Sequence, residues 1–403
     1  MFFQFGFYSS ILLISFTHGI VYSILLFFKA VQDENKSNYW LSLFLFLCSL
    51  YIAPWMLGFA GWYDNQPFRD IMFYMTFQHL FLLGPVIFFY VQSLLNPNFK
   101  LNKQNFLHLL PGILYIIYSI VIVVTDKLIL KRYYFLADTT DREFDSWYQY
   151  AGFFSMLFYF GLSLRYYLKF QKLMPQLVSF SDNLVFKWIK TFLMAFLVML
   201  ILQVATYIFG ICFPNTQTYI GSWWYFFFFS IIMYYIAITG YANSKKTTIP
   251  FSFDLFQSNK VFLLPMHENE KVEEIDFEEI EKSKPIKEDI QLWKNKIVDL
   301  FETKMLFKNP DLTLTDLAKN LDTNVAIISR TINQGFQLNF NDFINQYRVE
   351  TVKKAFEKGE HKKSTLLGIA FDCGFNSKAT FNRAFKKNTG LSPKEYLEKV
   401  HLV

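Results

Sequence analysis

The sequence predicts an all-α protein in which a seven-helix transmembrane bundle is followed by a soluble helical domain. Its 403 residues include 50 Phe, 53% of them are hydrophobic, and the mean hydropathy is +0.22, a composition that soluble proteins rarely have. Most of the hydrophobic residues lie before about residue 240. From residue 287 onward, apolar residues recur at helical spacing among charged ones, as Ile290, Trp293, Ile297, Leu300 and Phe301 illustrate.

Seven apolar stretches are each about long enough to cross the hydrocarbon core of a bilayer. Tryptophans such as Trp40, Trp147 and Trp188 lie near their ends, where aromatic side chains favour the membrane interface. No positively charged region precedes the first stretch, so we expect it to remain as a membrane helix and not to be cleaved as a signal peptide. The predicted spans are approximately 7–28, 39–59, 71–95, 106–124, 147–170, 188–213 and 219–240.

The distribution of Lys and Arg predicts the orientation of these spans. Basic residues are concentrated in the first, third and fifth loops, and Lys245 and Lys246 follow the last span. Because loops rich in Lys and Arg stay on the cytoplasmic side, the N-terminus is expected outside and the C-terminal domain inside. The sequence therefore predicts a multi-pass protein of the cytoplasmic (inner) membrane.

The most informative stretch of the soluble part predicts two short helices around a tight turn. Thr365 and Ser377 are residue types that accept hydrogen bonds from the free N–H groups of a helix start. Gly374 supplies the left-handed residue that a sharp turn between helices needs, and Gly390 ends the second helix. This is the arrangement of a helix-turn-helix motif.

A similar pattern lies upstream, near 313–334, and precedes a helix over 341–356 that would join it to the pattern near 365–388. Thr313 and Asp316 have the spacing of a capping box.

These positions resemble the DNA-binding signature of AraC/XylS-type regulators over roughly the last quarter of the chain. The residues of the second pattern that carry the resemblance are Ile369, Ala370, Gly374, Phe375, Phe381, Arg383, Phe385, Lys386, Lys387, Gly390, Pro393 and Tyr396. Those of the first pattern and the joining helix are Leu317, Ala318, Leu321, Asn324, Ile327, Ile328, Ser329, Arg330, Phe340, Phe343, Ile344, Asn345, Tyr347 and Arg348. The resemblance implies two helix-turn-helix units that bind double-stranded DNA.

The resemblance also implies which side chains face DNA. In the second unit the expected DNA-binding residues are Ser377, Lys378, Ala379, Asn382, Arg383, Lys386 and Lys387, and in the first unit Ala326, Ser329 and Arg330. Arg can bond guanine with two donors and Asn can do the same with adenine. For Arg383 and Arg330 a phosphate contact or an ion pair within the domain is the alternative. The two recognition helices are expected about 34 Å apart, in successive major-groove segments.

The segment 244–287 has the composition of a linker, so we predict domains at 1–243 and 288–403 with a partly acidic linker between them. Residues 268–281 are mostly acidic. They form either a solvated tether or an acidic strip that competes with DNA for the basic domain.

Polar side chains within the predicted spans are the candidates for sensing a ligand. Structural hydrogen bonding is the alternative role for each histidine. The candidate ligand-sensing residues are His18, Gln78, His79, His108 and Gln203.

Catalytic and metal-binding patterns are absent from the sequence. Cys48, Cys212 and Cys373 are far apart, and no zinc-like spacing, nucleophile elbow or phosphate-binding glycine loop occurs. We therefore expect no enzymatic activity, no cofactor and no metal.

Gly84-Pro85, Phe89-Tyr90-Val91 and His108-Leu109-Leu110-Pro111 resemble the N-terminal halves of membrane-bound AraC-type regulators. The resemblance implies a membrane-bound transcription regulator that couples a membrane or extracellular signal to promoter binding. Its expected partners are double-stranded DNA, the lipid bilayer, an unidentified small-molecule or membrane signal, and a second copy in a homodimer. The alternatives are a transporter or membrane enzyme with an appended DNA-binding domain, and a purely structural membrane anchor.

Overall fold

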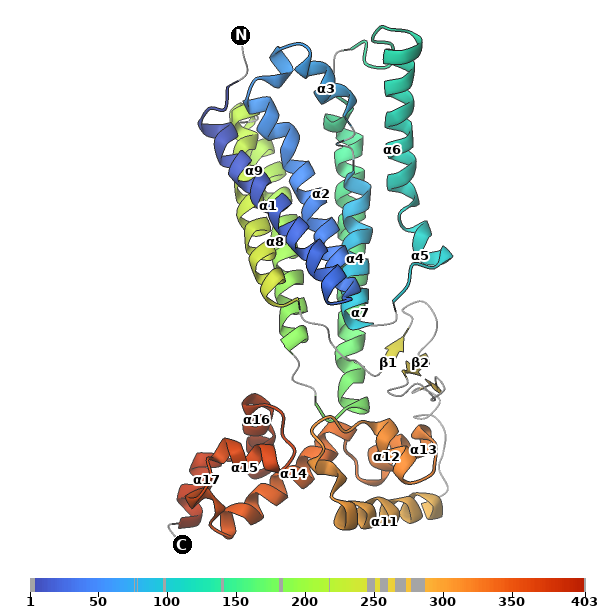
Figure 1. The fold of residues 1–403 in the computed structure, drawn as a ribbon, viewed down its shortest axis with the longest axis vertical. Helices are drawn as coiled ribbons and strands as arrows, with labels where there is room; N and C mark the ends of the chain where they lie inside the picture. The colour runs from blue at the N-terminus through green and yellow to red at the C-terminus, as the bar shows by residue number, and fades with distance from the viewer. Residues whose placement is uncertain are drawn as a thin grey trace. The chain divides into compact units, whose positions relative to one another are not determined.

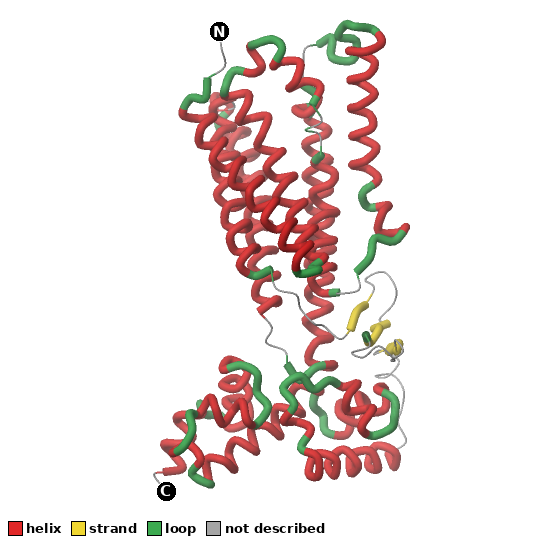
Figure 2. Tube along the Cα trace, viewed as in Figure 1, coloured by secondary structure: helices red, strands yellow, loops and turns green. Residues whose placement is uncertain are grey.

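The structure, a computed structural model, describes residues 4–75, 77, 79–96, 99–138, 141–180, 184–216, 218–244, 251–253, 260–264, 273–276 and 287–401. Most of these residues are helical, as the all-α prediction expects (Figure 2). The chain divides into two compact units, the first formed by 1–167 and 187–248 and the second by 168–186 and 249–403.

The first unit is a bundle of long helices that run alongside one another (Figure 1). α1 packs along α2 and α9, and α2 also packs on α4. The long helices are α1 (Phe7–Gln32), α2 (Lys36–Phe59), α4 (Leu80–Leu95), α6 (Leu110–Val123), α7 (Ser146–Leu177), α8 (Leu184–Cys212) and α9 (Tyr219–Ala242). Shorter elements are η1 (Trp62–Asp64), α3 (Phe68–Tyr74), α5 (Lys103–Leu107), η2 (Val124–Ile129), η3 (Arg142–Phe144) and η4 (Pro214–Thr216).

Small side chains and paired serines hold α1 and α2 together. A Cβ atom added to Gly19 would lie 2.1 Å from Ser49 Oγ, so glycine at this position lets α1 approach α2 closely. The buried hydroxyls of Ser23 and Ser42 each donate to the other residue's carbonyl oxygen, at 2.8 and 2.7 Å. Close backbone contact and interhelical hydrogen bonds are the interactions that stabilise helix pairs in apolar surroundings.

Among the described residues, five helices are long and apolar enough to cross a membrane: 7–32, 36–59, 110–129, 187–212 and 219–242. The expected third span, 71–95, divides into the seven-residue α3 and the sixteen-residue α4. The expected fifth span, 147–170, lies in α7, whose 32 residues include many Tyr residues and, in the second half, Arg165 and Lys169. These polar groups lower the hydropathy of α7, so the apolar helices support five of the seven predicted spans.

The second unit contains a small antiparallel sheet in the order β1-β2-β3. Its strands are β1 (Phe251–Phe253), β2 (Lys260–Leu263) and β3 (Glu273–Asp276), and Phe251 pairs with Leu263. The sequence prediction of a linker over 244–287 included no strands, because segments of three or four residues are too short for alternation to be recognised. The rest of the acidic stretch 268–281 lies outside the described residues.

The C-terminal part of α7 belongs to the second unit and supports this sheet. Phe170 is fully buried, and its ring stacks on Phe251 with centroids 4.6 Å apart. Phe253 lies on the same side, 6.1 Å from Phe170, while Lys169 lies over the Phe253 ring. Strand β1 therefore packs on a helix that precedes it by about eighty residues.

The remainder of the second unit is helical, with a buried core. Ile297, Leu300 and Phe301 of the predicted stripe are buried, whereas Ile290 and Trp293 are half-buried. The helices are α11 (Lys287–Lys304), η5 (Leu306–Lys308), α12 (Leu314–Asn320), α13 (Val325–Arg330), η6 (Thr331–Gly335), α14 (Phe340–Glu357), η7 (Glu360–Lys362), α15 (Leu366–Asp372), α16 (Lys378–Thr389) and α17 (Pro393–His401).

Candidate nucleic-acid interface

Helices α15 and α16 form a pair with a well-defined turn. The Thr365 hydroxyl accepts from Gly368 N at 3.0 Å, and the Ser377 hydroxyl accepts from Thr380 N at 3.1 Å. Gly374 has φ +96° and Gly390 has φ +75°, both in the left-handed region that favours glycine. All four predicted positions are confirmed.

The turn glycine also lies against the loop that precedes α12. A Cβ atom at Gly374 would lie 2.5 Å from the carbonyl oxygen of Phe307 and 2.8 Å from Lys308 Cα. Both neighbours are backbone atoms, which cannot move aside easily. Gly374 is therefore required for its φ angle and for the close packing of this turn on η5.

Helix α16 separates an apolar face from a polar one. Phe381 is 2% exposed and Phe385 is fully buried, and both join a core with Ile369 and Ala370 of α15. The opposite face of α16 is exposed, and on it lie Lys378, Ala379, Asn382, Arg383 and Lys386. This face presents cations and an amide to the surroundings, as a helix that contacts phosphate and base edges requires.

Two of the predicted DNA-binding residues of this pair have partners inside the domain. The Lys387 ammonium lies 2.7 Å from the carboxylate of Asp342 in the first turn of α14. The Ser377 hydroxyl caps α16 and also lies 2.8 Å from Thr380 Oγ1. Lys387 thus connects α16 to α14, a contact that its prediction as a DNA-binding residue did not include.

Helices α12 and α13 form the upstream pair. The predicted capping box is present: Asp316 accepts from Thr313 N at 2.9 Å, and the Thr313 hydroxyl accepts from Asp316 N at 3.2 Å. Asp322 adopts φ +49° in the turn, and Asn324 accepts from Ile327 N at 2.8 Å. These contacts define where each helix begins.

Ser329 does not lie on the exposed face of α13 where the prediction put it. Its side chain is 1% exposed, because it belongs to the buried stripe of Val325, Ile328 and Ile332. Asn333 Nδ2 lies 3.5 Å from Ser329 Oγ.

The accessible stripe of this helix includes Ala326 and Arg330, both half-buried, and continues to Asn333 on the η6 turn. The sequence prediction did not include Asn333, because it listed only the positions Ala326, Ser329 and Arg330 that the resemblance implied. Its position three residues after Arg330, on the same helix face, is the signal that could have identified it.

A buried arginine connects the two helix pairs. Arg348 of α14 is 1% exposed and donates from Nε to Phe307 O and from Nη2 to Asn309 O, both at 2.7 Å. Its Cζ atom lies 5.9 Å from the centroid of the Phe375 ring, next to the Gly374 turn. Burial lowers the pKa of Arg348 to about 10, so the guanidinium remains charged at neutral pH.

The described ligand-sensing candidates do not form a single site. His18 stacks on the Tyr234 ring at 3.7 Å, His79 Nε2 lies 2.7 Å from Leu47 O, and His108 Nδ1 lies 2.9 Å from the Tyr159 hydroxyl. These contacts fit the structural role that was the alternative to ligand sensing for each histidine. Gln78 lies outside the described residues.

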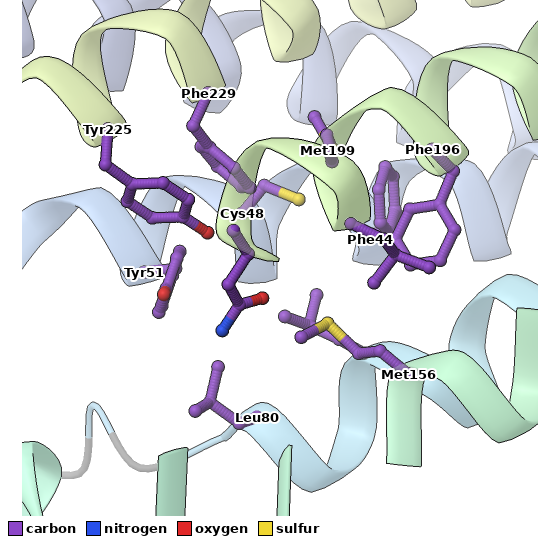
Figure 3. A pocket seen from close by; sticks show the side chains of 12 residues that line it. Phe44, Cys48, Tyr51, Leu80, Met156, Phe196, Met199, Tyr225 and Phe229 are labelled. Carbon is purple, nitrogen blue, oxygen red and sulfur yellow. The ribbon is translucent and has the colours of Figure 1, made fainter. Parts of the chain in front are cut away.

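Gln203 lines a small cavity within the first unit, where Cys48, Tyr51 and Tyr225 surround the same space (Figure 3). The cavity volume is about 20 Å³, which is room for about one water molecule. Its other lining residues are Phe44, Leu80, Leu83, Met156, Phe196, Met199, Leu200 and Phe229. Within the described part of the chain, no group of His, Cys, Asp and Glu side chains could hold a metal ion.

The paired helices and the exposed polar face of α16 define a helical DNA-binding domain. Comparison with known families agrees, since the model of the helix-turn-helix domain matches residues 317–399. The C-terminal part of the chain is thus an AraC-type helix-turn-helix domain.

The similar curated proteins are uncharacterised HTH-type transcriptional regulators of Staphylococcus aureus strains COL, MSSA476 and N315, each 29% identical over 102 residues. These 102 residues are 25% of this chain and 13% of each relative, so the chain matches only about an eighth of the relatives' length. No solved structure matches the chain.

Proposed function

We propose that the protein is a membrane-embedded regulator of transcription that binds promoter DNA through two helix-turn-helix units. The α12–α13 pair is the first unit, the α15–α16 pair is the second, and α14 joins them. The observation that carries the proposal is the capped helix α16, whose buried Phe381 and Phe385 turn Asn382 and Arg383 outward. The family match over residues 317–399 and the regulators it resembles support the same function.

The surface of the first unit supports a location within the bilayer. Large apolar side chains on its helices are exposed, among them Ile14 (68%), Phe154 (63%) and Ile211 (74%). Apolar surface of this extent is costly in water and favourable in lipid. We propose that α4 and α7 complete a seven-helix bundle with the five apolar helices, with the N-terminus outside and the C-terminal domain in the cytoplasm. A signal received by the bundle then changes promoter binding.

The DNA-binding proposal is tested with the full-length protein in lipid nanodiscs. Sequences selected from a random duplex library give the preferred site, and the affinities of Arg383→Ala and Lys386→Ala are then compared on preferred and altered sites. Arg383→Ala should lose about 1–3 kcal/mol of discrimination at one base pair. Lys386→Ala, the matched cation on the same helix, should weaken binding to all sequences alike. Equal binding to every duplex by the unaltered protein would refute sequence-specific recognition.

The topology is tested separately with reporter fusions after Val403. A reporter that is active only in the cytoplasm should be active in this fusion. A reporter that is active only outside the cell should be silent in the same position. The opposite pattern would refute the proposed orientation without bearing on DNA recognition.

A further inference from the structure

Helix α7 ends inside the second unit, in contact with the DNA-binding domain. The helix spans Ser146–Leu177, and the division between the two units falls after Tyr167. The two residues that follow it, Val178 and Ser179, have no exposed surface. The segment that leaves α7 is therefore an integral part of the domain's interior.

This segment is held by backbone hydrogen bonds. Val178 forms an antiparallel bridge with Thr313, the residue that caps α12. Ser179 N donates to Leu312 O at 3.1 Å, and Asn341 Nδ2 of α14 lies 3.5 Å from Val178 O. The bridge thus engages the start of the first helix pair and the joining helix together.

Ser179 also completes the hydrogen bonding of Arg348. The Arg348 Nη2 atom donates to Ser179 Oγ at 3.1 Å, and Nη1 donates to Ser179 O at 3.4 Å. The Ser179 hydroxyl in turn lies 3.4 Å from Pro310 O. A buried guanidinium whose donors lose their acceptors is strongly destabilising, so the arginine favours the state in which Ser179 is docked.

Arg348 contacts both helix pairs at this point. Its acceptors Phe307 O and Asn309 O belong to the loop that leads into α12, and the Phe307 carbonyl packs against the Gly374 turn that leads into α16. The position of α16 relative to α13 consequently depends on the same few atoms that hold Ser179.

We propose that Val178–Ser179 is a regulatory latch. While it is docked, the two helix pairs keep one relative placement. When a signal displaces the end of α7, Arg348 loses two acceptors and that placement is released. The inference rests on the proposed function and adds how the membrane part would control DNA binding. The latch changes how well both recognition helices fit one duplex at the same time. It leaves the contact of each helix with its own DNA segment intact.

The test compares full-length protein in nanodiscs on two duplexes. One contains the complete selected site, and the other retains only the segment read by α16. Ser179→Ala removes the hydroxyl acceptor, and Ser179→Pro also removes the N–H donor to Leu312. Ser163→Ala is the matched control, because Ser163 is a fully buried serine of α7 whose hydroxyl bonds Tyr159 O within the same helix.

We expect Ser179→Pro to lose about tenfold in affinity for the complete site, within the range of allosteric coupling, and Ser179→Ala to lose less. Binding to the single segment should stay unchanged for both, and Ser163→Ala should match the unaltered protein on both duplexes. Unchanged single-segment binding also shows that the α16 unit of each variant is folded.

Ser179 variants that bind the complete site as tightly as the unaltered protein, or that lose the same factor on both duplexes, would refute the latch alone. An unaltered protein that binds neither duplex would refute the proposed function and the latch with it.

Discussion

The ammonium of Lys387 lies 2.7 Å from the carboxylate of Asp342, so a side chain from the last turn of α16 reaches the first turn of α14. Lys386, its neighbour, is exposed on the same helix. Two adjacent lysines that a sequence cannot tell apart therefore have different surroundings, and they should contribute differently to DNA binding.

The slope of log affinity against log salt concentration is negative for DNA binding. We predict that Lys386→Ala lowers the magnitude of this slope by about 0.9, the value for one phosphate contact. Lys387→Ala should change this slope much less, because its charge is already compensated by Asp342. The check is a salt titration of DNA affinity for both variants. In an Asp342→Ala background Lys387 has lost its ion-pair partner, so Lys387→Ala should then lower the magnitude of the slope too. Identical slopes for all variants would contradict the pairing.

In the first helix pair, Ser329→Ala should leave DNA affinity unchanged because the Ser329 side chain is 1% exposed. Asn333→Ala should weaken binding by about tenfold, the loss expected when a base-edge contact of about 1–3 kcal/mol is removed. Affinity on the selected site measures both. A larger loss for Ser329→Ala than for Asn333→Ala would show that the exposed stripe of α13 is not the DNA-facing one.

Gly374→Ala should destabilise the domain more than Gly359→Ala. Both glycines have positive φ, +96° and +78°, so each substitution costs about 1–2 kcal/mol of backbone strain. Only at Gly374 does the added Cβ also meet backbone, whereas nothing lies within 4 Å of it at Gly359. The temperature at which DNA binding is lost on heating should therefore fall further for Gly374→Ala. Equal shifts would mean that the turn does not pack on η5.

The Cys373 thiol should react slowly with alkylating reagents. Burial raises its pKa to about 11 from an ordinary value near 9, so at pH 8 only about one thiol in a thousand is ionised. Alkylation in a Cys48→Ser/Cys212→Ser protein should accelerate as the pH approaches 11. Since the folded state keeps this proton to higher pH than the unfolded state, stability should also fall between pH 9 and 11, and Cys373→Ala should remove that fall. Rapid alkylation at pH 7 would contradict the burial.

Features set by a few neighbouring residues could be predicted from the sequence. The caps at Thr365 and Ser377, the left-handed Gly374 and the capping box of Thr313 depend on local hydrogen bonds and backbone angles. Because each of these signals is contained within a few residues, the amino-acid sequence is sufficient to predict the helix starts and the turn that they define.

Features that depend on contacts distant in sequence could not be predicted. Three contacts illustrate this: the Lys387 ion pair, the packing of β1 on Phe170 and the docking of Ser179. The residues that they join are 45 to 169 positions apart in the sequence. Ser329 is the exception, because its place among Val325, Ile328 and Ile332 follows from helical spacing. The resemblance suggested that it faces DNA, and the periodicity of its neighbours was the better guide.

The latch also imposes an order on the synthesis and folding of the chain. Arg348 follows Ser179 by 169 positions, so the ribosome needs on the order of 10–30 seconds to make the arginine after the serine, at about 5–20 residues per second. During that interval α8 and α9 are made, and Ser179 lacks the guanidinium that donates to it in the docked arrangement. The complete docked arrangement can form only after Arg348 has been synthesised, so a nascent chain stalled before Arg348 would lack the hydrogen bonds from the guanidinium to Ser179.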